Sequence, residues 1–234
     1  AYAALNTRHN FTVIRNGLDC TLIEQAFREW SQSKARTSIG AQDGEVVVLL
    51  LGTVCARKGQ QDLIKALSRL PAECCERVRW YIVGDRPSEY SRTLHALTNE
   101  LPRVLRSRVH IVPETRHTTP YYRAADLFLC TSKVESYPRV VLEAMAYGLP
   151  IVTTPVFGIR EQVREGVNAL FYEPGDAEEL AAHLHRLLSD DGLRSRMGEK
   201  SASVLAMGTS FEEMVDGYAE VFAEAWLSSG GQTA

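Results

Sequence analysis

Residues 46–70, with the sequence VVVLLLGTVCARKGQQDLIKALSRL, combine three features that decide the fold. The uninterrupted apolar run Val46–Leu51 is typical of a β-strand that is buried on both faces. A loop with two glycines follows the run, and over residues 60–70 apolar side chains recur at the spacing of an amphipathic helix. A buried strand that leads through a loop into a helix is the first unit of a parallel sheet covered by helices.

The same alternation of apolar runs and helical patterns continues along the chain. The pattern predicts further helices at 88–101, 139–147 and 177–188, and further strands at 78–83, 109–112, 127–130, 151–154 and 169–172. We therefore expect an α/β fold of the Rossmann-like, doubly wound type, with a mostly parallel six-stranded sheet and helices on both faces.

Two segments stand apart from this alternation. Residues 29–45 are polar and carry two glycines, which predicts an exposed excursion before the main sheet. Residues 211–226 predict a long helix, and helical spacing alone indicates a face that packs against the core. The apolar side of that helix consists of Phe211, Met214, Val215, Tyr218, Phe222 and Trp226.

Composition excludes several classes of protein. The chain has 234 residues, a net charge of −3 and 45% hydrophobic residues, which argues against a broad nucleic-acid surface. The five cysteines contain no C-x-x-C pair, so neither a disulfide framework nor a zinc site is indicated, and we expect a cytoplasmic protein. The strongest apolar run is far shorter than the ~20 residues of a membrane-spanning helix.

Glycine, charged and hydroxyl side chains gather where the predicted strands end. In an open parallel sheet, ligands bind beyond the carboxyl ends of the strands. We therefore expect a ligand site along this rim, formed by the exit segments 52–59, 84–87, 113–114, 131–135 and 154–158.

The sharpest constellation on this rim is ESYPRVVLE, residues 135–143. Pro138 suits the first turn of a helix, where its missing N–H is no loss. The N–H groups of residues 139–141 are then free to face an anion, helped by the helix dipole. The carboxylates of Glu135 and Glu143 are placed to accept hydrogen bonds from hydroxyls on either side of a diphosphate. The spacing alone fits equally well a helix start with two unrelated surface glutamates.

The loop after the first strand supplies cations to the same rim. Arg57 and Lys58 precede Gly59, just before a helix. Lysine suits a phosphate as a compact point charge, and glycine lets the backbone approach closely. A Lys-Gly pair is by itself also compatible with a plain turn. The loop is neither a P-loop nor a dinucleotide fingerprint, because the chain lacks both glycine patterns.

Together these segments resemble the C-terminal domain of the family 4 glycosyltransferases, retaining enzymes with the two-lobed GT-B fold. The resemblance runs in order from about Val13 to Phe222. It is carried by the entry motif at 16–19, the G-R-x-x-x-x-K-G loop at 52–59, the V-G-x-G turn at 83–85, YRAAD at 122–126, the E-x7-E motif at 135–143 with EAMAYGLP at 143–150, and Gly158 with Glu161 of a G-G-x-x-E loop.

The resemblance implies a substrate and a set of site residues. The substrate would be a nucleoside diphosphate sugar, UDP-linked as is commonest in the family, with no cofactor and no metal. Lys58 and Glu135 would be catalytic, with Lys58 on the diphosphate and Glu135 on the sugar hydroxyls, and Glu143 would bind the ribose. The implied donor-binding set is Gly52, Thr53, Arg57, Lys58, Gly84, Val112, Glu114, Glu135, Tyr137, Pro138, Arg139, Val140 and Glu143.

Two positions depart from the family pattern. Thr53 stands where the family has a phosphate-binding arginine, and Arg57 offers a substitute from a different backbone position. Phe157 replaces the first glycine of the G-G pair. These departures leave donor affinity and acceptor choice open.

The resemblance also implies a domain organisation. We expect residues 1–12 to be the remnant of an interdomain linker, 13–227 the donor-binding domain and 228–234 a disordered tail. A separate N-terminal lobe would bind the acceptor, and any peripheral membrane contact would be made only by that lobe. The isolated domain is then expected to be inactive. The helix at 211–226 would pack partly on that lobe, so we expect an exposed apolar strip and self-association.

Two alternative functions stay open at this point. Sugar-nucleotide 2-epimerases share the two-lobed architecture, and a non-catalytic module could bind nucleotide sugars without turning them over. Metal-dependent transfer is disfavoured, because no two aspartates are two residues apart. His183 and His185 point to different sides of their predicted helix, so they are not expected to be ligands.

Overall fold

A computed structural model describes residues 11–228 of the chain. Within them, six strands form one sheet in the order β3-β2-β1-β4-β5-β6, and every neighbouring pair is parallel. The strands are β1 (Val46–Leu51), β2 (Val78–Asp85), β3 (Val109–Pro113), β4 (Leu127–Cys130), β5 (Ile151–Thr153) and β6 (Ala169–Phe171). This order confirms the expected Rossmann-like, doubly wound fold.

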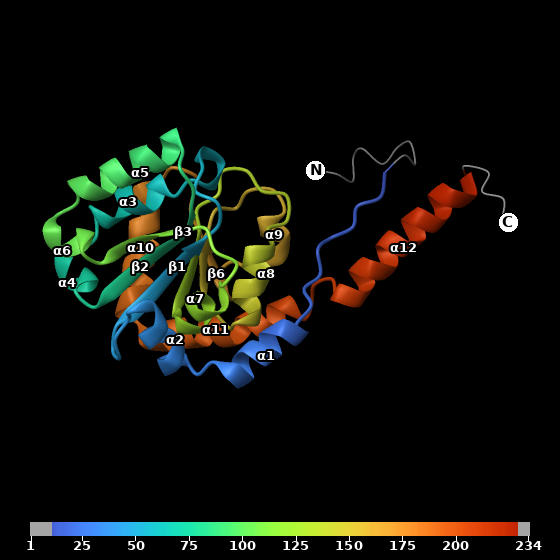
Figure 1. Ribbon diagram of the computed structural model, residues 1–234, viewed down its shortest axis with the longest axis horizontal. Coiled ribbons are helices and arrows are strands. Elements are labelled where there is room, and N and C mark those ends of the chain that lie inside the picture. The colour runs from blue at the N-terminus through green and yellow to red at the C-terminus, as the bar shows by residue number, and fades with distance from the viewer. Residues whose placement is uncertain (1–10, 229–234) are drawn as a thin grey trace.

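Helices cover both faces of the sheet (Figure 1). They are α1 (Thr21–Glu29), α2 (Gln32–Ile39), the 3₁₀ turn η2 (Ala56–Lys58), α3 (Gln61–Leu67), α4 (Ala72–Cys75), α5 (Glu89–Glu100), α6 (Arg103–Arg106), α7 (Thr119–Ala124), α8 (Arg139–Ala146), α9 (Ile159–Gln162), α10 (Ala177–Ser189), α11 (Asp191–Leu205) and α12 (Phe211–Ser228). The helices predicted at 60–70, 88–101, 139–147 and 177–188 are present, and α3 ends three residues earlier than expected.

The core is divided by the sheet into two apolar layers. In β1, Val48 and Leu50 point to one layer, with α3, α5 and α10, whereas Val47 and Leu49 point to the other, with α7 and α8. Such alternation is what a strand imposes on its side chains. Because both layers are apolar, the strands read as continuous hydrophobic runs.

The segment 29–45 is largely exposed, as expected, but it contains a helix that was not predicted. The segment contains α2, whose Ala35 is fully buried and which packs against α7. The Ser31 side chain caps its amino end, and Arg36 forms an ion pair with Asp126 at 2.6 Å. The polar composition did not indicate this helix, because Ala35 is its one buried residue and the polar side chains are largely exposed.

The last helix, α12, projects from the α/β body, and the extended residues before α1 run beside it (Figure 1). Val215, Tyr218, Phe222 and Trp226 are each between 46% and 71% exposed. The core-packing interpretation of this helix is therefore wrong, and the expected exposed apolar strip is present. Of the expected linker remnant, 1–12, residues 1–10 lie outside the described residues. Of the expected tail, 228–234, residues 229–234 lie outside them, and Ser228 belongs to α12.

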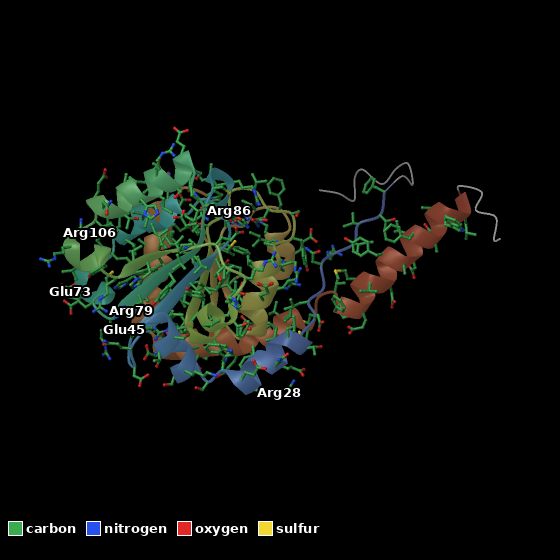
Figure 2. The ribbon with its side chains drawn as sticks, viewed as in Figure 1. Arg28, Glu45, Glu73, Arg79, Arg86 and Arg106 are labelled. Carbon is green, nitrogen blue, oxygen red and sulfur yellow. The ribbon has the colours of Figure 1, made fainter. Side chains whose placement is uncertain are left out.

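An ion-pair cluster ties the amino ends of the central strands together. Glu45, just before β1, pairs with Arg79 of β2 and with Arg108 before β3, both at 2.5 Å. Figure 2 shows Glu45 and Arg79 close together, with Arg86 at the opposite end of the sheet. Glu45, Arg79 and Arg108 are thus paired with one another. Within residues 11–228, no helix combines the length and apolar character needed to cross a lipid bilayer.

Candidate functional site

The loops after β1 and β4 meet at the carboxyl edge of the sheet. β1 and β4 are neighbours although they are not consecutive in sequence, so the order in which strands are added to the sheet reverses here. The Thr131 hydroxyl donates to the Lys58 carbonyl and the Lys133 N–H to the Arg57 carbonyl, each at 2.7 Å. Gly59, at φ +66°, makes this approach possible, because a Cβ there would lie 2.2 Å from the Thr131 carbonyl oxygen.

These loops bring the predicted catalytic pair into contact. The Lys58 ammonium donates to Oε1 of Glu135, and Arg57 Nη1 and the Ser132 hydroxyl reach the same oxygen at 3.1 Å. The side chains of Lys58 and Glu135 are 13% and 9% exposed, whereas Arg57 is 55% exposed. The expected rim therefore holds a buried lysine–carboxylate pair with a second, solvent-facing cation.

Glycines form the floor beneath Lys58. A Cβ on Gly52 would lie 3.6 Å from Lys58 Cε, and a Cβ on Gly84 would lie 2.4 Å from the Gly52 carbonyl oxygen. The Val54 N–H donates to the Gly84 carbonyl at 2.9 Å. The predicted residues of the first two exit loops are thus packed directly against each other.

Gln60 is a site residue that the sequence reasoning missed. It is fully buried, its side-chain amide donates to the Thr53 carbonyl at 3.0 Å, and its Oε1 accepts from the Cys55 N–H at 3.4 Å. Gln60 therefore fixes the shape of the loop that carries Thr53. The available signal was a polar residue directly after the Lys-Gly pair, at the start of an otherwise apolar helix face.

The amino end of α8 differs from the expectation in two details. Pro138 is the residue before the helix rather than a member of its first turn. The Val141 N–H is not free, because it donates to the Pro138 carbonyl at 3.2 Å. No side chain caps this end of α8 among the described residues, which leaves the N–H groups of Arg139 and Val140 as the candidates to meet an anion.

Neighbouring segments hold the loop before α8 in place. Asn16 donates to the Tyr137 carbonyl at 2.9 Å, and Gln162 donates to the Pro138 carbonyl at 3.0 Å. A Cβ on Gly158 would lie 1.7 Å from the Ser136 carbonyl oxygen. Phe157, directly before it, is 59% exposed and has φ +46°, which is rare for a residue other than glycine. Phe157 thus presents an aromatic ring beside the rim.

Glu143 has a different partner from Glu135. Its Oε2 accepts a hydrogen bond of 2.8 Å from the hydroxyl of Tyr122, whose ring stacks on Tyr147 with centroids 5.0 Å apart. Tyr122 is 2% exposed, and this burial, together with the Glu143 charge, raises the pKa of its phenol. The phenol therefore stays protonated and donates to Glu143. Tyr122 belongs to the YRAAD motif, but the sequence did not indicate its contact with Glu143.

Val112 and Glu114 lie further along the rim, at the end of β3. Glu114 forms an ion pair with Arg86, which follows β2, and both side chains are substantially exposed. Arg86 was not predicted as its partner. Figure 2 places Arg86 at the edge of the sheet opposite Glu45 and Arg79. Within the part of the chain that the structure describes, no group of three or more His, Cys, Asp or Glu side chains could hold a metal ion.

The sheet has the strand order β3-β2-β1-β4-β5-β6 and carries the site on its carboxyl edge. This arrangement is that of one lobe of the two-lobed GT-B fold. Residues 31–204 match the family described as Glycosyl transferases group 1, and the chain belongs to this family. The predicted resemblance is therefore confirmed.

Curated proteins with similar sequences are also glycosyltransferases. The chain is 33% identical over 177 residues to the lipopolysaccharide core biosynthesis glycosyltransferase LpsE of Rhizobium meliloti, covering 76% of this chain and 49% of the relative. It is 33% identical over 202 residues to a D-inositol 3-phosphate glycosyltransferase of Xylanimonas cellulosilytica, covering 83% and 47%. The chain thus spans about half the length of these curated relatives.

Solved structures show the same fold. A crystal structure of Anabaena Alr3699/HepE in complex with UDP-glucose has a TM-score of 0.81 at 26% identity, covering 95% of this chain and 60% of that one. The C-terminal domain of LpcC from Francisella tularensis, at 18% identity, has a TM-score of 0.68 and covers 77% and 93%. The second likeness concerns the fold alone.

Proposed function

We propose that this chain is the donor-binding lobe of a retaining glycosyltransferase that uses a UDP-linked sugar. The observation that carries the proposal is the meeting of Lys58 and Glu135 at the switch between β1 and β4. The crevice at such a switch point is where open α/β sheets bind their ligands. The UDP and UDP-glucose complexes of the similar Anabaena protein support a UDP-linked donor.

Lys58 and the first turn of α8 grip the diphosphate in this proposal. The ammonium of Lys58 and the N–H groups of Arg139 and Val140 supply positive charge on two sides of the phosphates. Arg57 supplies the second cation in place of the arginine that Thr53 replaces. Gly84 lets the first two exit loops pack together, and Gly52 leaves room for the Lys58 side chain. Tyr137 and Pro138 border the ligand.

The two glutamates bind hydroxyl groups. Glu135 accepts hydrogen bonds from the transferred sugar, and Glu143, oriented by Tyr122, accepts them from the ribose. The base lies beside Val112 and Glu114. Hydrogen bonds to a charged acceptor contribute roughly 1.5–3 kcal/mol each, which is enough to favour ligands rich in hydroxyls.

Catalysis follows from the placement of positive charge. As the sugar leaves, negative charge develops on the departing diphosphate, and Lys58, Arg57 and the α8 amino end stabilise it. The reaction needs no metal ion and no cofactor, proceeds with retention, and takes its acceptor from a separate lobe, without which this lobe is inactive. The five free thiols support a cytoplasmic site of action.

Calorimetric titration of the 234-residue chain with UDP, GDP, ADP and UDP-glucose tests the proposal. We expect UDP and UDP-glucose to bind more tightly than GDP and ADP. Lys58→Ala and Glu143→Ala should each weaken UDP binding at least about five-fold, because each removes a charged contact to the ligand.

Lys65→Ala is the matched control, since it removes an exposed lysine of α3 outside the site. It should leave the affinity unchanged. Thermal unfolding of each variant establishes that the fold is retained. Unchanged UDP affinity in both Lys58→Ala and Glu143→Ala would remove the assigned site.

A further inference from the structure

One oxygen of Glu135 accepts three hydrogen bonds. Oε1 accepts from the Lys58 ammonium, Arg57 and Ser132, whereas Oε2 has no partner among the residues that the structure describes. Lys58, the more buried of the two cations, is the group that the proposed function assigns to the diphosphate. Without a ligand, therefore, the phosphate-binding lysine is already engaged by the residue that is assigned to the sugar.

Releasing Lys58 from this pair is costly. Glu135 is 9% exposed, so little water is available to take the place of a lost cation. Breaking a buried ion pair by withdrawing one partner is strongly unfavourable, because it leaves a charge without compensation. Arg57 compensates only in part, because it is 55% exposed and reaches Glu135 at 3.1 Å.

We propose that the Lys58–Glu135 pair makes the site discriminate against a nucleoside diphosphate that carries no sugar. The inference rests on the proposed function and deepens it. When a sugar is attached, its hydroxyls donate hydrogen bonds to Glu135 in place of the Lys58 ammonium. Lys58 is then free to bind the phosphates, and the Glu135 carboxylate keeps its hydrogen-bond donors. A free nucleoside diphosphate also attracts the Lys58 ammonium, but it offers no hydroxyl to donate a hydrogen bond to Glu135.

The same coupling assists product release. After transfer the sugar hydroxyls are gone, and Glu135 competes again for Lys58 against the bound diphosphate. Glu135 is thus a specificity-determining residue as well as a sugar contact. Its carboxylate strengthens binding of the donor and weakens binding of the product.

The test compares the dissociation constants of UDP and UDP-glucose for the 234-residue chain and its Glu135→Gln variant by calorimetry. Glutamine keeps the shape but releases Lys58 from the charge. We expect UDP to bind the variant about five-fold more tightly than the unaltered chain, whereas UDP-glucose gains nothing or loses affinity. The preference for UDP-glucose over UDP should therefore fall.

Glu45→Gln is the matched control, because Glu45 is also a buried carboxylate that binds two cations, at the opposite edge of the sheet. It should leave the ratio of the two affinities unchanged. Equal or weaker UDP binding by a folded Glu135→Gln variant would overturn the inference while leaving the donor site intact. Failure of the unaltered chain to bind either ligand would overturn the proposed function, and the inference with it.

Discussion

At the scale of single residues, the site depends on how each carboxylate is held. Glu135 is fixed by cations, whereas Glu143 is fixed by a neutral phenol. Burial and the neighbouring Glu143 charge raise the pKa of Tyr122, so its hydroxyl remains a donor at physiological pH. We therefore propose that Tyr122 is a positioning residue, which orients Glu143 toward the proposed ribose site.

Tyr122→Phe tests this positioning role. The substitution removes only the hydroxyl, and we expect UDP binding to weaken about three-fold, because Glu143 loses a hydrogen bond that fixes its orientation. The loss should vanish with 2′,3′-dideoxyuridine diphosphate, which offers Glu143 no ribose hydroxyl. A merely structural role would lower both affinities together.

The neighbouring Tyr121→Phe provides the control for removal of a phenol from α7, and it should leave both affinities unchanged. Calorimetry with the two nucleotides supplies the comparison. An equal loss for UDP and for the dideoxy analogue in Tyr122→Phe would contradict the assignment.

The sequence predicts some of these contacts and misses others for physical reasons. The approach of Lys58 to Glu135 is predictable, because the carboxyl ends of neighbouring parallel strands meet at one edge. The partners of Gln60 are not predictable, because they depend on how the irregular loop before α3 folds back on itself. The partner of Glu143 is not predictable, because it depends on how α7 packs against α8. The Val141 N–H was predicted to face a ligand, but it donates to the Pro138 carbonyl instead.

At the scale of elements, Glu45 joins the amino ends of the strands. Burial raises the pKa of its carboxyl, but hydrogen bonds from Arg79, the Gln42 N–H and Arg108 outweigh burial and lower that pKa overall. A carboxyl with a lowered folded-state pKa stabilises the fold above its unfolded pKa, about 4.3 for glutamate. The stabilisation is lost as the pH falls from there through the folded-state pKa.

Glu45→Gln tests this contribution. We expect the variant to be about 2 kcal/mol less stable at pH 7, because hydrogen bonds to a charged acceptor are replaced by weaker ones. The difference in stability should shrink below about pH 4, where the carboxyl of the unaltered chain becomes protonated. Urea unfolding at pH 7 and pH 3 measures it, and an equal difference at both pH values would contradict the account.

Elements differ in how far the sequence predicts them. The strands are evident because burial on both faces makes them continuously apolar. The helix α2 was not predicted within the exposed segment 29–45, because its one buried residue, Ala35, leaves no apolar periodicity to recognise. The short helices α7 and α9 have too few turns for a periodic pattern to emerge.

At the scale of the whole molecule, the chain spans about half the length of its curated relatives. The helix α12 projects from the body with Val215, Tyr218 and Phe222 between 46% and 71% exposed (Figure 1). The proposed acceptor lobe would cover part of this strip. Without that lobe, apolar surface of this kind favours association between copies of the chain.

Phe222→Asp tests the strip. We expect the unaltered chain to self-associate at tens of micromolar and the variant to be monomeric, because a charge cannot be buried cheaply in an apolar contact. Sedimentation velocity across a concentration series gives the measurement. Val104→Asp, the same kind of change at an exposed position of α6, is the control and should not alter association. Identical sedimentation of the unaltered chain and Phe222→Asp would contradict the assignment.

The most direct test of the central claim is a crystal structure of the chain with bound UDP-glucose. The account predicts the diphosphate between Lys58 and the amino end of α8, with Glu135 bonded to sugar hydroxyls and Glu143 bonded to the ribose. A diphosphate bound away from Lys58, with the Lys58–Glu135 pair undisturbed, would contradict it.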